Sequence, residues 1–249
     1  MKSGSFDGIA NKFDKNIYGT TKGRLRHALL THYLVDCLDA ETPLSVLDAG
    51  GGTGMMSYEF ASRGHRVDIL DVSSETLDIA KQRLIDFPET NYICGDIGSV
   101  ERQYDLIICH ALLEWLDDPI LALDKLIHML RPEGVLSLSF FNQDAMLFNN
   151  AIYGNFDYIA KGMKVRNVVR LNPHNPQSPA KVIAKLEASD HIDIEFKAGI
   201  RCFHDYMRDT TMQSTHFDNI LMLEKQYGAT APYMWLGKYF YIRLKKASA

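Results

Sequence analysis

A glycine-rich turn from Asp48 to Gly54 constrains the fold of this chain more than any other segment. It joins a short apolar run at 45–50, which predicts a buried strand, to a helical pattern at 55–63. Glycine allows positive φ angles and close approach of the backbone to a ligand, and the start of a helix presents free N–H groups. This order of strand, turn and helix predicts a nucleotide pocket at the carboxyl edge of an open α/β sheet.

The spacing of the glycines argues against a dinucleotide as the ligand. That ligand requires Gly-x-Gly-x-x-Gly, and in each of the three possible registers a required glycine is replaced, by Met55, Thr53 or Ser57. The pattern Asp-x-Gly-x-Gly-x-Gly stands there instead. It resembles the first motif of class I methyltransferases, which bind a nucleoside without a pyrophosphate. The alternative is a tight turn that only packs a helix onto a strand.

Strand and helix patterns alternate through the middle of the chain, which is typical of βαβ units with parallel strands and right-handed crossovers. Strands are predicted at 66–72, 92–97, 105–110 and 135–142, helices from Ser73 or Ser74 onward and over 118–130, and a turn at 131–134. The second half predicts helices at 146–162, 179–189 and 217–226, and strands at 191–202 and 232–246.

The resemblance to class I methyltransferases implies a Rossmann-like α/β fold. Its seven-stranded sheet is mostly parallel, with the last strand inserted antiparallel and helices on both faces. We expect one domain over residues 1–249, with an N-terminal helical cap at about 1–40 and a basic insertion at about 143–190.

Polar side chains end the strands that follow the glycine turn. Asp71 ends the second predicted strand, where a carboxylate can accept hydrogen bonds from both ribose hydroxyls. Asp96 and Ile97 end the third, at a position that resembles the adenine-contacting turn of class I methyltransferases. His110 ends the fourth, next to the expected methionine end; the alternative is a hydrogen-bonded core histidine. Together these groups predict one ligand-binding rim.

The distribution of charge is uneven although the net charge is only −4. Residues 158–186 contain no acidic residue and six basic ones: Lys161, Lys164, Arg166, Arg170, Lys181 and Lys185. Residues 15–35 also lack acids and contain Lys15, Lys22, Arg24 and Arg26. Such segments indicate a surface for a polyanion, and chance clustering is the alternative.

The remaining composition indicates a cytoplasmic enzyme without metal. The four cysteines are scattered and form no Cys-x-x-Cys pair, which favours a reducing compartment over disulfides or zinc. The N-terminus lacks the apolar core of a signal peptide, and no apolar run is long enough to span a membrane.

Five further segments are similar to the bacterial tRNA 5-carboxymethoxyuridine methyltransferases, and they extend over nearly the whole chain. They are Phe6–Ala10, Asn16–Gly23, His110–Trp115, Gly154–Tyr158 and Arg201–Tyr206. This family methylates the carboxylate of carboxymethoxyuridine at the tRNA wobble position, giving the methyl ester. The resemblance therefore implies S-adenosylmethionine as cofactor and tRNA bearing carboxymethoxyuridine as partner.

The same resemblance implies which residues contact the cofactor. They are Arg26, Gly51, Gly52, Asp71, Asp96, Ile97 and His110, to which the glycine motif adds Asp48 and Gly50. Arg26 also stands out by itself, because it begins the apolar stripe of a helix capped by Thr20 or Thr21, where an unpaired charge is costly. The donor carboxylate would pair with it; the alternative is a guanidinium that extends into water.

The implied chemistry needs no general base, because a carboxylate with a pKa near ~4 is already ionised at neutral pH. We expect positioning of the reactants to suffice, with Arg201 or a basic residue of the insertion holding the acceptor carboxylate. The candidate tRNA-binding residues are Lys22, Lys161, Lys164, Arg166, Arg170 and Arg201. Tyr18, Tyr158 and Tyr206 are candidates for stacking on the base, with core packing as the alternative.

Three other functions remain open at this stage. A methyltransferase for a small carboxyl or quinone compound would need an apolar pocket and no basic face. A nucleoside-binding module would bind the cofactor without turnover. An NAD dehydrogenase is disfavoured by the glycine spacing. The oligomeric state is not determined by these patterns.

Overall fold

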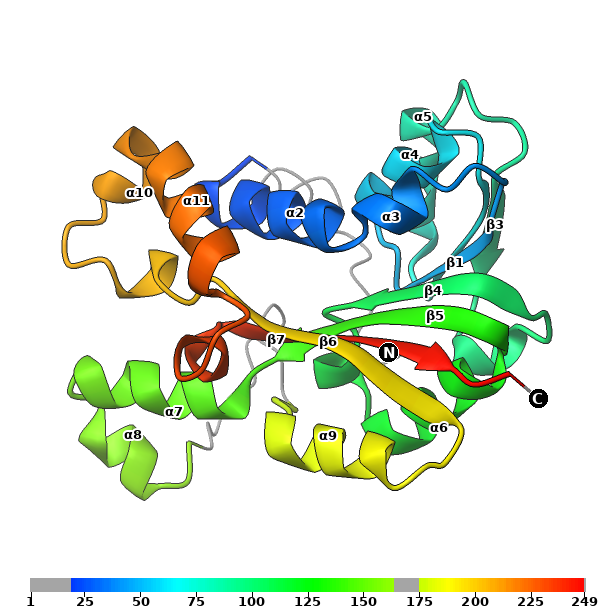
Figure 1. Ribbon diagram of the computed structural model, residues 1–249. Coiled ribbons are helices and arrows are strands. Elements are labelled where there is room, and N and C mark those ends of the chain that lie inside the picture. Colours follow the sequence, from blue (N-terminus) through cyan, green and yellow to red (C-terminus); the bar gives the residue numbers. More distant parts are fainter. Residues whose placement is uncertain (1–18, 164–174, 249) are drawn as a thin grey trace.

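The computed structural model describes residues 19–163 and 175–248, which form one seven-stranded sheet of order β3-β2-β1-β4-β5-β7-β6 (Figure 1). The strands are β1 (Ser45–Ala49), β2 (Arg66–Asp71), β3 (Asn91–Cys94), β4 (Tyr104–His110), β5 (Leu130–Phe141), β6 (Ile192–Ile200) and β7 (Tyr239–Lys246). Strands β1 to β5 pair in parallel, whereas β7 lies between β5 and β6 and is antiparallel to both. The predicted fold class is confirmed.

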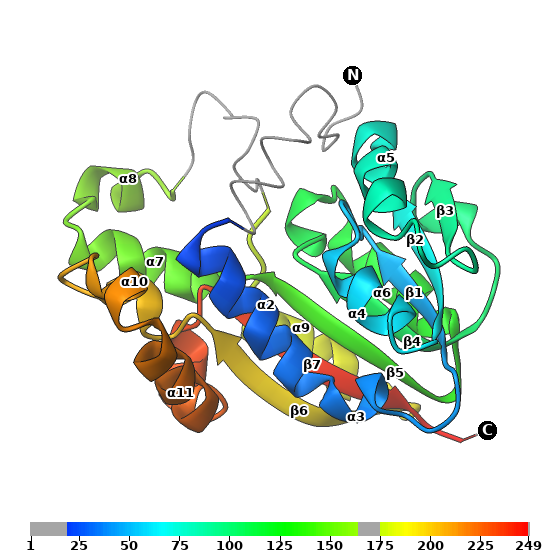
Figure 2. The ribbon, with the colours of Figure 1, turned by 90° about the horizontal axis from the view of Figure 1, so that it is seen from above.

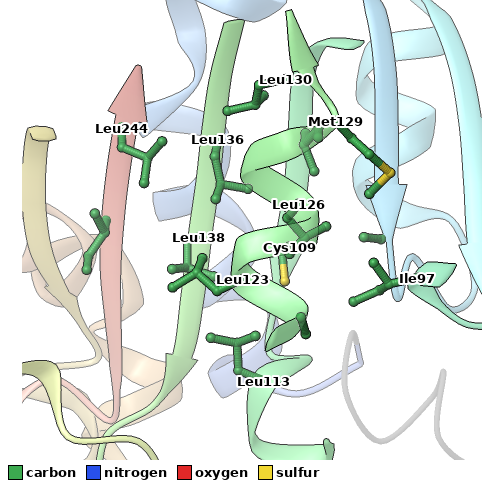
Figure 3. Close-up of a cluster of buried hydrophobic side chains, with 14 of the residues drawn as sticks. Ile97, Cys109, Leu113, Leu123, Leu126, Met129, Leu130, Leu136, Leu138 and Leu244 are labelled. Carbon is green, nitrogen blue, oxygen red and sulfur yellow. The ribbon is translucent and has the colours of Figure 1, made fainter. Parts of the chain in front are cut away.

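Helices cover both faces of the sheet (Figures 1 and 2). One face carries α2 (Thr21–Tyr33), α3 (Val35–Leu38), α4 (Met55–Ala61), α5 (Ser74–Arg83) and α11 (Phe217–Tyr227); the other carries α6 (Pro119–His128) and α9 (Pro179–Glu187). Helices α7 (Gln143–Ile152), α8 (Phe156–Ala160) and α10 (Met212–Thr215) extend beyond the carboxyl ends of the parallel strands. Figure 3 shows Leu123 and Leu126 of α6 packed against β4 and β5.

Side-chain caps begin the helices where the sequence predicts them. Thr20 accepts a hydrogen bond from the Gly23 N–H and begins α2. Ser73 and Asp118 begin α5 and α6 in the same way. A capping side chain satisfies an N–H group that has no partner within its own helix, so these starts are determined locally.

Several predicted boundaries are wrong. The expected strand at 92–97 ends at Cys94, because the Asp96 side chain caps a 3-10 helix that begins at Ile97. The expected turn at 131–134 lies inside β5 as an irregularity, where Glu133 has φ 63° and the pairing with β4 shifts register. The expected helix at 146–162 is divided into α7 and α8, because Gly154 between them has φ 74°. The expected strand at 232–246 begins only at Tyr239, since residues 233–236 form a 3-10 helix.

The antiparallel insertion of β7 determines what lies beside the ligand edge. Its first residue, Tyr239, pairs with Phe141 at the end of β5 and with Ile200 at the end of β6. The start of β7 therefore lies at the carboxyl edge of the parallel strands, although it belongs to the last segment of the chain.

No helix in the described part of the chain is long and apolar enough to cross a membrane. The proposed division into cap, core and insertion remains a prediction.

Candidate functional site

A cavity of about 340 Å³ opens at the carboxyl ends of β1, β2 and β4. Every predicted cofactor residue except Asp48 lines it: Arg26, Gly50, Gly51, Gly52, Asp71, Asp96, Ile97 and His110. The structure thus brings together residues from α2, the glycine turn and three strand ends. The parallel strands share one carboxyl edge, which is why these separate segments meet.

The glycine turn is shaped by both its backbone and its surroundings. Gly50, Gly52 and Gly54 have φ angles of 71°, 55° and 76°, which side-chain-bearing residues rarely adopt. A Cβ atom on Gly51 would lie 2.8 Å from the side chain of Ile69. The turn therefore tolerates little beyond glycine, and its backbone forms one wall of the cavity.

The carboxylate of Asp71 is oriented by two backbone groups. Its Oδ2 accepts a hydrogen bond from the Gly52 N–H at 3.0 Å, and its Oδ1 accepts one from the Ser73 N–H at 2.9 Å. A carboxylate has about four acceptor positions, so these two bonds by themselves do not saturate it. The Asp71 carboxylate is thus held in a fixed orientation at the end of β2, where it lines the cavity.

Asp48 lies beneath the turn and is 4% exposed. Its Oδ2 accepts a hydrogen bond of 2.6 Å from the Ser57 hydroxyl of α4. Burial raises the pKa of Asp48 to about 6, against the opposing effect of that hydrogen bond. It lines a second cavity of about 40 Å³, which it shares with Arg26 and His110. Its position supports the turn from below.

His110 combines a buried hydrogen bond with a polar atom that lacks a partner. Its Nε2 lies 2.8 Å from the Ser137 hydroxyl oxygen, which lies 3.0 Å from the Tyr241 hydroxyl oxygen. Within the described residues, its Nδ1 has no hydrogen-bond partner. Burial, together with the smaller effect of the charge of Arg26, lowers the pKa of His110 to about 3. The imidazole is therefore neutral at physiological pH.

The third strand end forms the far side of the cavity. The Asp96 side chain accepts a hydrogen bond of 2.8 Å from the Gly98 N–H and begins the short 3-10 helix at 97–99. Ile97 is buried and packs into the core below, so its side chain is a fixed apolar surface in the cavity wall.

Arg26 approaches the cavity from α2, one turn into the helix. Its guanidinium carbon lies 5.3 Å from the centre of the Tyr239 ring, within the range of a cation–π interaction. Both side chains line the cavity. A positive charge is therefore held at the end of the cavity where His110 lies.

The comparisons with known proteins agree with this geometry. A family model described as a methyltransferase domain matches residues 47–136. The tRNA 5-carboxymethoxyuridine methyltransferase of Escherichia coli (strain K12) is 41% identical over 99% of this chain and 97% of its own length. This chain belongs to the tRNA 5-carboxymethoxyuridine methyltransferase family. It is thereby a class I S-adenosylmethionine-dependent methyltransferase.

Solved structures show the same fold at low sequence identity. Magnesium protoporphyrin IX methyltransferase of Synechocystis PCC 6803, solved with bound S-adenosylhomocysteine, has a TM-score of 0.64 at 15% identity and covers 98% of this chain and 96% of its own. A plantazolicin methyltransferase, also solved with S-adenosylhomocysteine, has a TM-score of 0.57 at 17% identity and covers 96% of this chain and 89% of its own.

Arg201, expected to hold the acceptor in this member of the family, lies beside the donor cavity. It has φ 65° and is 9% exposed. Its Nε donates to Asp205 Oδ1 at 2.9 Å, and its Nη2 donates to Asp205 Oδ2. Burial alone would raise the pKa of Asp205, but His204 and Arg201 hold that pKa well below its usual range. A buried carboxylate of the protein therefore already engages Arg201.

The other candidate residues for tRNA are placed only in part. Lys22 and Lys161 are exposed. Lys164, Arg166 and Arg170 lie outside the described residues, as does Tyr18. Tyr206 donates its hydroxyl to the Leu236 carbonyl at 2.9 Å and packs against Phe148, which favours a structural role. The contacts with tRNA remain predictions.

Sequence reasoning missed two aromatic walls of the cavity, Trp115 and Tyr239. Trp115 belongs to the segment after His110 that carries the family resemblance, so its position was a usable signal. Tyr239 had no local signal, because its place depends on the pairing of β7.

Across residues 19–163 and 175–248, no group of His, Cys, Asp or Glu is arranged to hold a metal ion, and all four cysteines are unpaired.

Proposed function

We propose that this protein transfers a methyl group from S-adenosylmethionine to the carboxylate of 5-carboxymethoxyuridine at the wobble position of tRNA, giving the methyl ester. One observation supports this choice of acceptor: the chain is 41% identical to a tRNA 5-carboxymethoxyuridine methyltransferase over 99% of its length. That relationship includes the second half of the chain, beyond the methyltransferase domain at 47–136. The similarity therefore includes segments outside the part of the chain that carries most of the donor residues.

The residues around the cavity fit the donor. We assign Asp71 to the ribose hydroxyls, because its carboxylate lines the cavity and is already oriented by Gly52. Asp96 and Ile97 are assigned to the adenine. Arg26 and His110 are assigned to the methionine end, since the unpartnered Nδ1 of His110 offers a polar contact there. Gly50, Gly51 and Asp48 shape and support the turn.

The proposed reaction requires positioning and not proton transfer. S-adenosylmethionine, when bound, supplies a methyl group that the acceptor oxygen takes up as the carbon–sulfur bond breaks, with the electron pair remaining on sulfur and no proton moving. The acceptor carboxylate is ionised at neutral pH, since its pKa is about 4 by analogy with Asp. The protein's contribution is then to orient the carboxylate and exclude water, as the aromatic walls Trp115 and Tyr239 would.

Contacts with tRNA are proposed for the basic residues of the N-terminal and insertion segments, together with the residue beside the donor cavity. They are Lys22, Lys161, Lys164, Arg166, Arg170 and Arg201. Exposed cations release counter-ions when they bind phosphates, so the affinity for tRNA should fall steeply as salt concentration rises. A small-molecule methyltransferase would show no such dependence.

The decisive experiment offers labelled S-adenosylmethionine with two preparations of one tRNA, one bearing carboxymethoxyuridine and one lacking it. The label should appear as a base-labile methyl ester in the tRNA that bears carboxymethoxyuridine and should be absent from the tRNA that lacks it. Neither tRNA should carry label that is stable to base. Transfer to the free nucleoside at the same rate would favour the small-molecule alternative. Absence of transfer to the modified tRNA would reject the proposed function.

A further inference from the structure

Three cations gather around a pair of aromatic rings at the start of β7. The rings of Phe141 and Tyr239 meet edge to face, with centres 5.9 Å apart and an angle of 68°. The Lys238 ammonium lies 4.9 Å from the centre of the Phe141 ring. The guanidinium carbons of Arg26 and Arg201 lie 5.3 Å and 5.8 Å from the centre of Tyr239. Because Tyr239 lines the donor cavity, this cluster lies next to it.

The backbone holds Lys238 firmly in this place. Its N–H donates to the Arg201 carbonyl at 3.4 Å, and its own carbonyl accepts from the Asn142 N–H at 3.2 Å. Lys238 is thus fastened to the ends of both neighbouring strands, immediately before β7 begins. An antiparallel strand inserted at this point brings its first residues to the carboxyl edge, where class I folds bind their ligands.

Charge compensation differs sharply between Arg201 and Lys238. Both carboxylate oxygens of Asp205 accept hydrogen bonds from the Arg201 guanidinium. Lys238, by contrast, forms no ion pair with any residue in 19–163 or 175–248, and its ammonium contacts the face of Phe141. Burial lowers the pKa of Lys238, and the charges of Arg201 and Lys22 lower it further, whereas Asp205 raises it. The carboxylate that acts on Lys238 is thus already paired with Arg201. A partly buried cation in this situation is stabilised when a further anion joins it.

We propose that Lys238 holds the carboxylate of the acceptor, beside Tyr239 and next to the donor cavity. This inference rests on the proposed function, because carboxymethoxyuridine supplies the anion. It moves the expected clamp from Arg201, whose charge Asp205 already balances, to the neighbouring lysine. An ammonium is suited to this role: it orients the carboxylate through one oxygen and leaves the other available to attack the methyl group.

The test compares Lys238→Met with Lys238→Arg, and uses Lys245→Met as the matched control. Lys245 lies near the opposite end of β7, far from the carboxyl edge, and pairs with Glu133. Binding of one tRNA with and without the carboxymethoxy group is measured at constant salt, together with kcat/KM for the modified tRNA. We expect Lys238→Met to lose about tenfold or more in kcat/KM and in preference for modified tRNA. Lys238→Arg should retain part of both, and Lys245→Met should retain all.

Three outcomes would overturn the inference. Equal loss of affinity for both tRNAs would make Lys238 a phosphate contact. If calorimetry showed weaker binding of S-adenosylmethionine to Lys238→Met, the lysine would be a contact of the donor instead. If Lys238→Met kept the full affinity and preference for the modified tRNA, Lys238 would have no role in recognising the carboxylate. Thermal unfolding of each variant separates these results from misfolding. Failure of the proposed function is distinct, because the unaltered protein would then not methylate the modified tRNA at all.

Discussion

The guanidinium carbon of Arg26 lies 5.3 Å from the centre of the Tyr239 ring. One residue comes from the first described helix and the other from the last strand, and both line the donor cavity. Under the proposed function, this contact joins the residues assigned to the donor to those proposed for the acceptor. A change at this contact should affect both substrates.

Replacing Arg26 by methionine should weaken binding of S-adenosylmethionine by about tenfold or more, because a charge-assisted contact with the donor carboxylate would be lost. Isothermal calorimetry measures the change in Kd. Arg24→Met is the matched control, since Arg24 lies two residues away, over the ring of Phe217 at 4.5 Å and outside the cavity lining. Equal effects of the two variants would contradict the assignment.

Replacing Asp71 by asparagine should also weaken binding of S-adenosylmethionine by about tenfold or more, with little change in the stability of the fold. The amide keeps the shape of the side chain but has only one acceptor oxygen for Gly52, Ser73 and the ribose. The same calorimetry tests this expectation. Asp78→Asn serves as control, because Asp78 is exposed on α5 and forms an ion pair with Lys81 away from the cavity. Full affinity in Asp71→Asn would remove the ribose assignment.

The pH dependence of the reaction should show no titration of His110. Burial lowers its pKa to about 3, so the neutral ring persists throughout pH 5–8. We expect His110→Asn to raise the Kd for S-adenosylmethionine while leaving the shape of the kcat profile between pH 6 and 8 unchanged. If the profile of the unaltered protein has a shoulder that this variant abolishes, His110 acts as a general base and the positioning mechanism is wrong.

Asp48 should make stability depend on pH. Its pKa is 3.8 in the reference state and about 6 in the fold, because burial disfavours the charged form. The folded protein therefore binds the proton more tightly, and the free energy of unfolding falls as pH rises from about 4 to 6, by up to about 3 kcal/mol. Urea unfolding at several pH values should show this loss in the unaltered protein and a smaller one in Asp48→Asn. Parallel curves for the two proteins would refute it.

Glu224 should be essential for the loop that carries Arg201. Its carboxylate accepts three backbone hydrogen bonds, from Cys202 at 2.8 Å, Phe203 at 2.9 Å and His204 at 3.2 Å. Glu224→Ala would leave three N–H groups without this partner, and we expect a loss of about 3 kcal/mol or more in the free energy of unfolding. Lys225→Ala, an exposed neighbour on the same helix, should change it little. Chemical denaturation compares the two variants.

The sequence alone predicts most of the residues that line the cavity at the carboxyl edge, because the features that carry them are local. Strand ends, caps and glycine turns are encoded within a few residues, and Asp71, Asp96 and His110 each follow an apolar strand pattern directly. One general rule, that parallel strands share a carboxyl edge, then brings these local features together. Their convergence on one cavity needed no knowledge of long-range pairing.

Only the tertiary structure decided which residues of the last segment lie beside the cavity. Tyr239 lines the cavity, with Lys238 next to it in the chain, because β7 begins at the carboxyl edge between β5 and β6. The sequence interpretation extended that strand from 232 through 246 without finding its true start. The pairing of Arg201 with Asp205 likewise depends on a loop held by Glu224 from a distant helix. Side-chain periodicity specifies which face of a strand is buried, but the partner strand and the charge that meets each cation follow from packing across the whole chain.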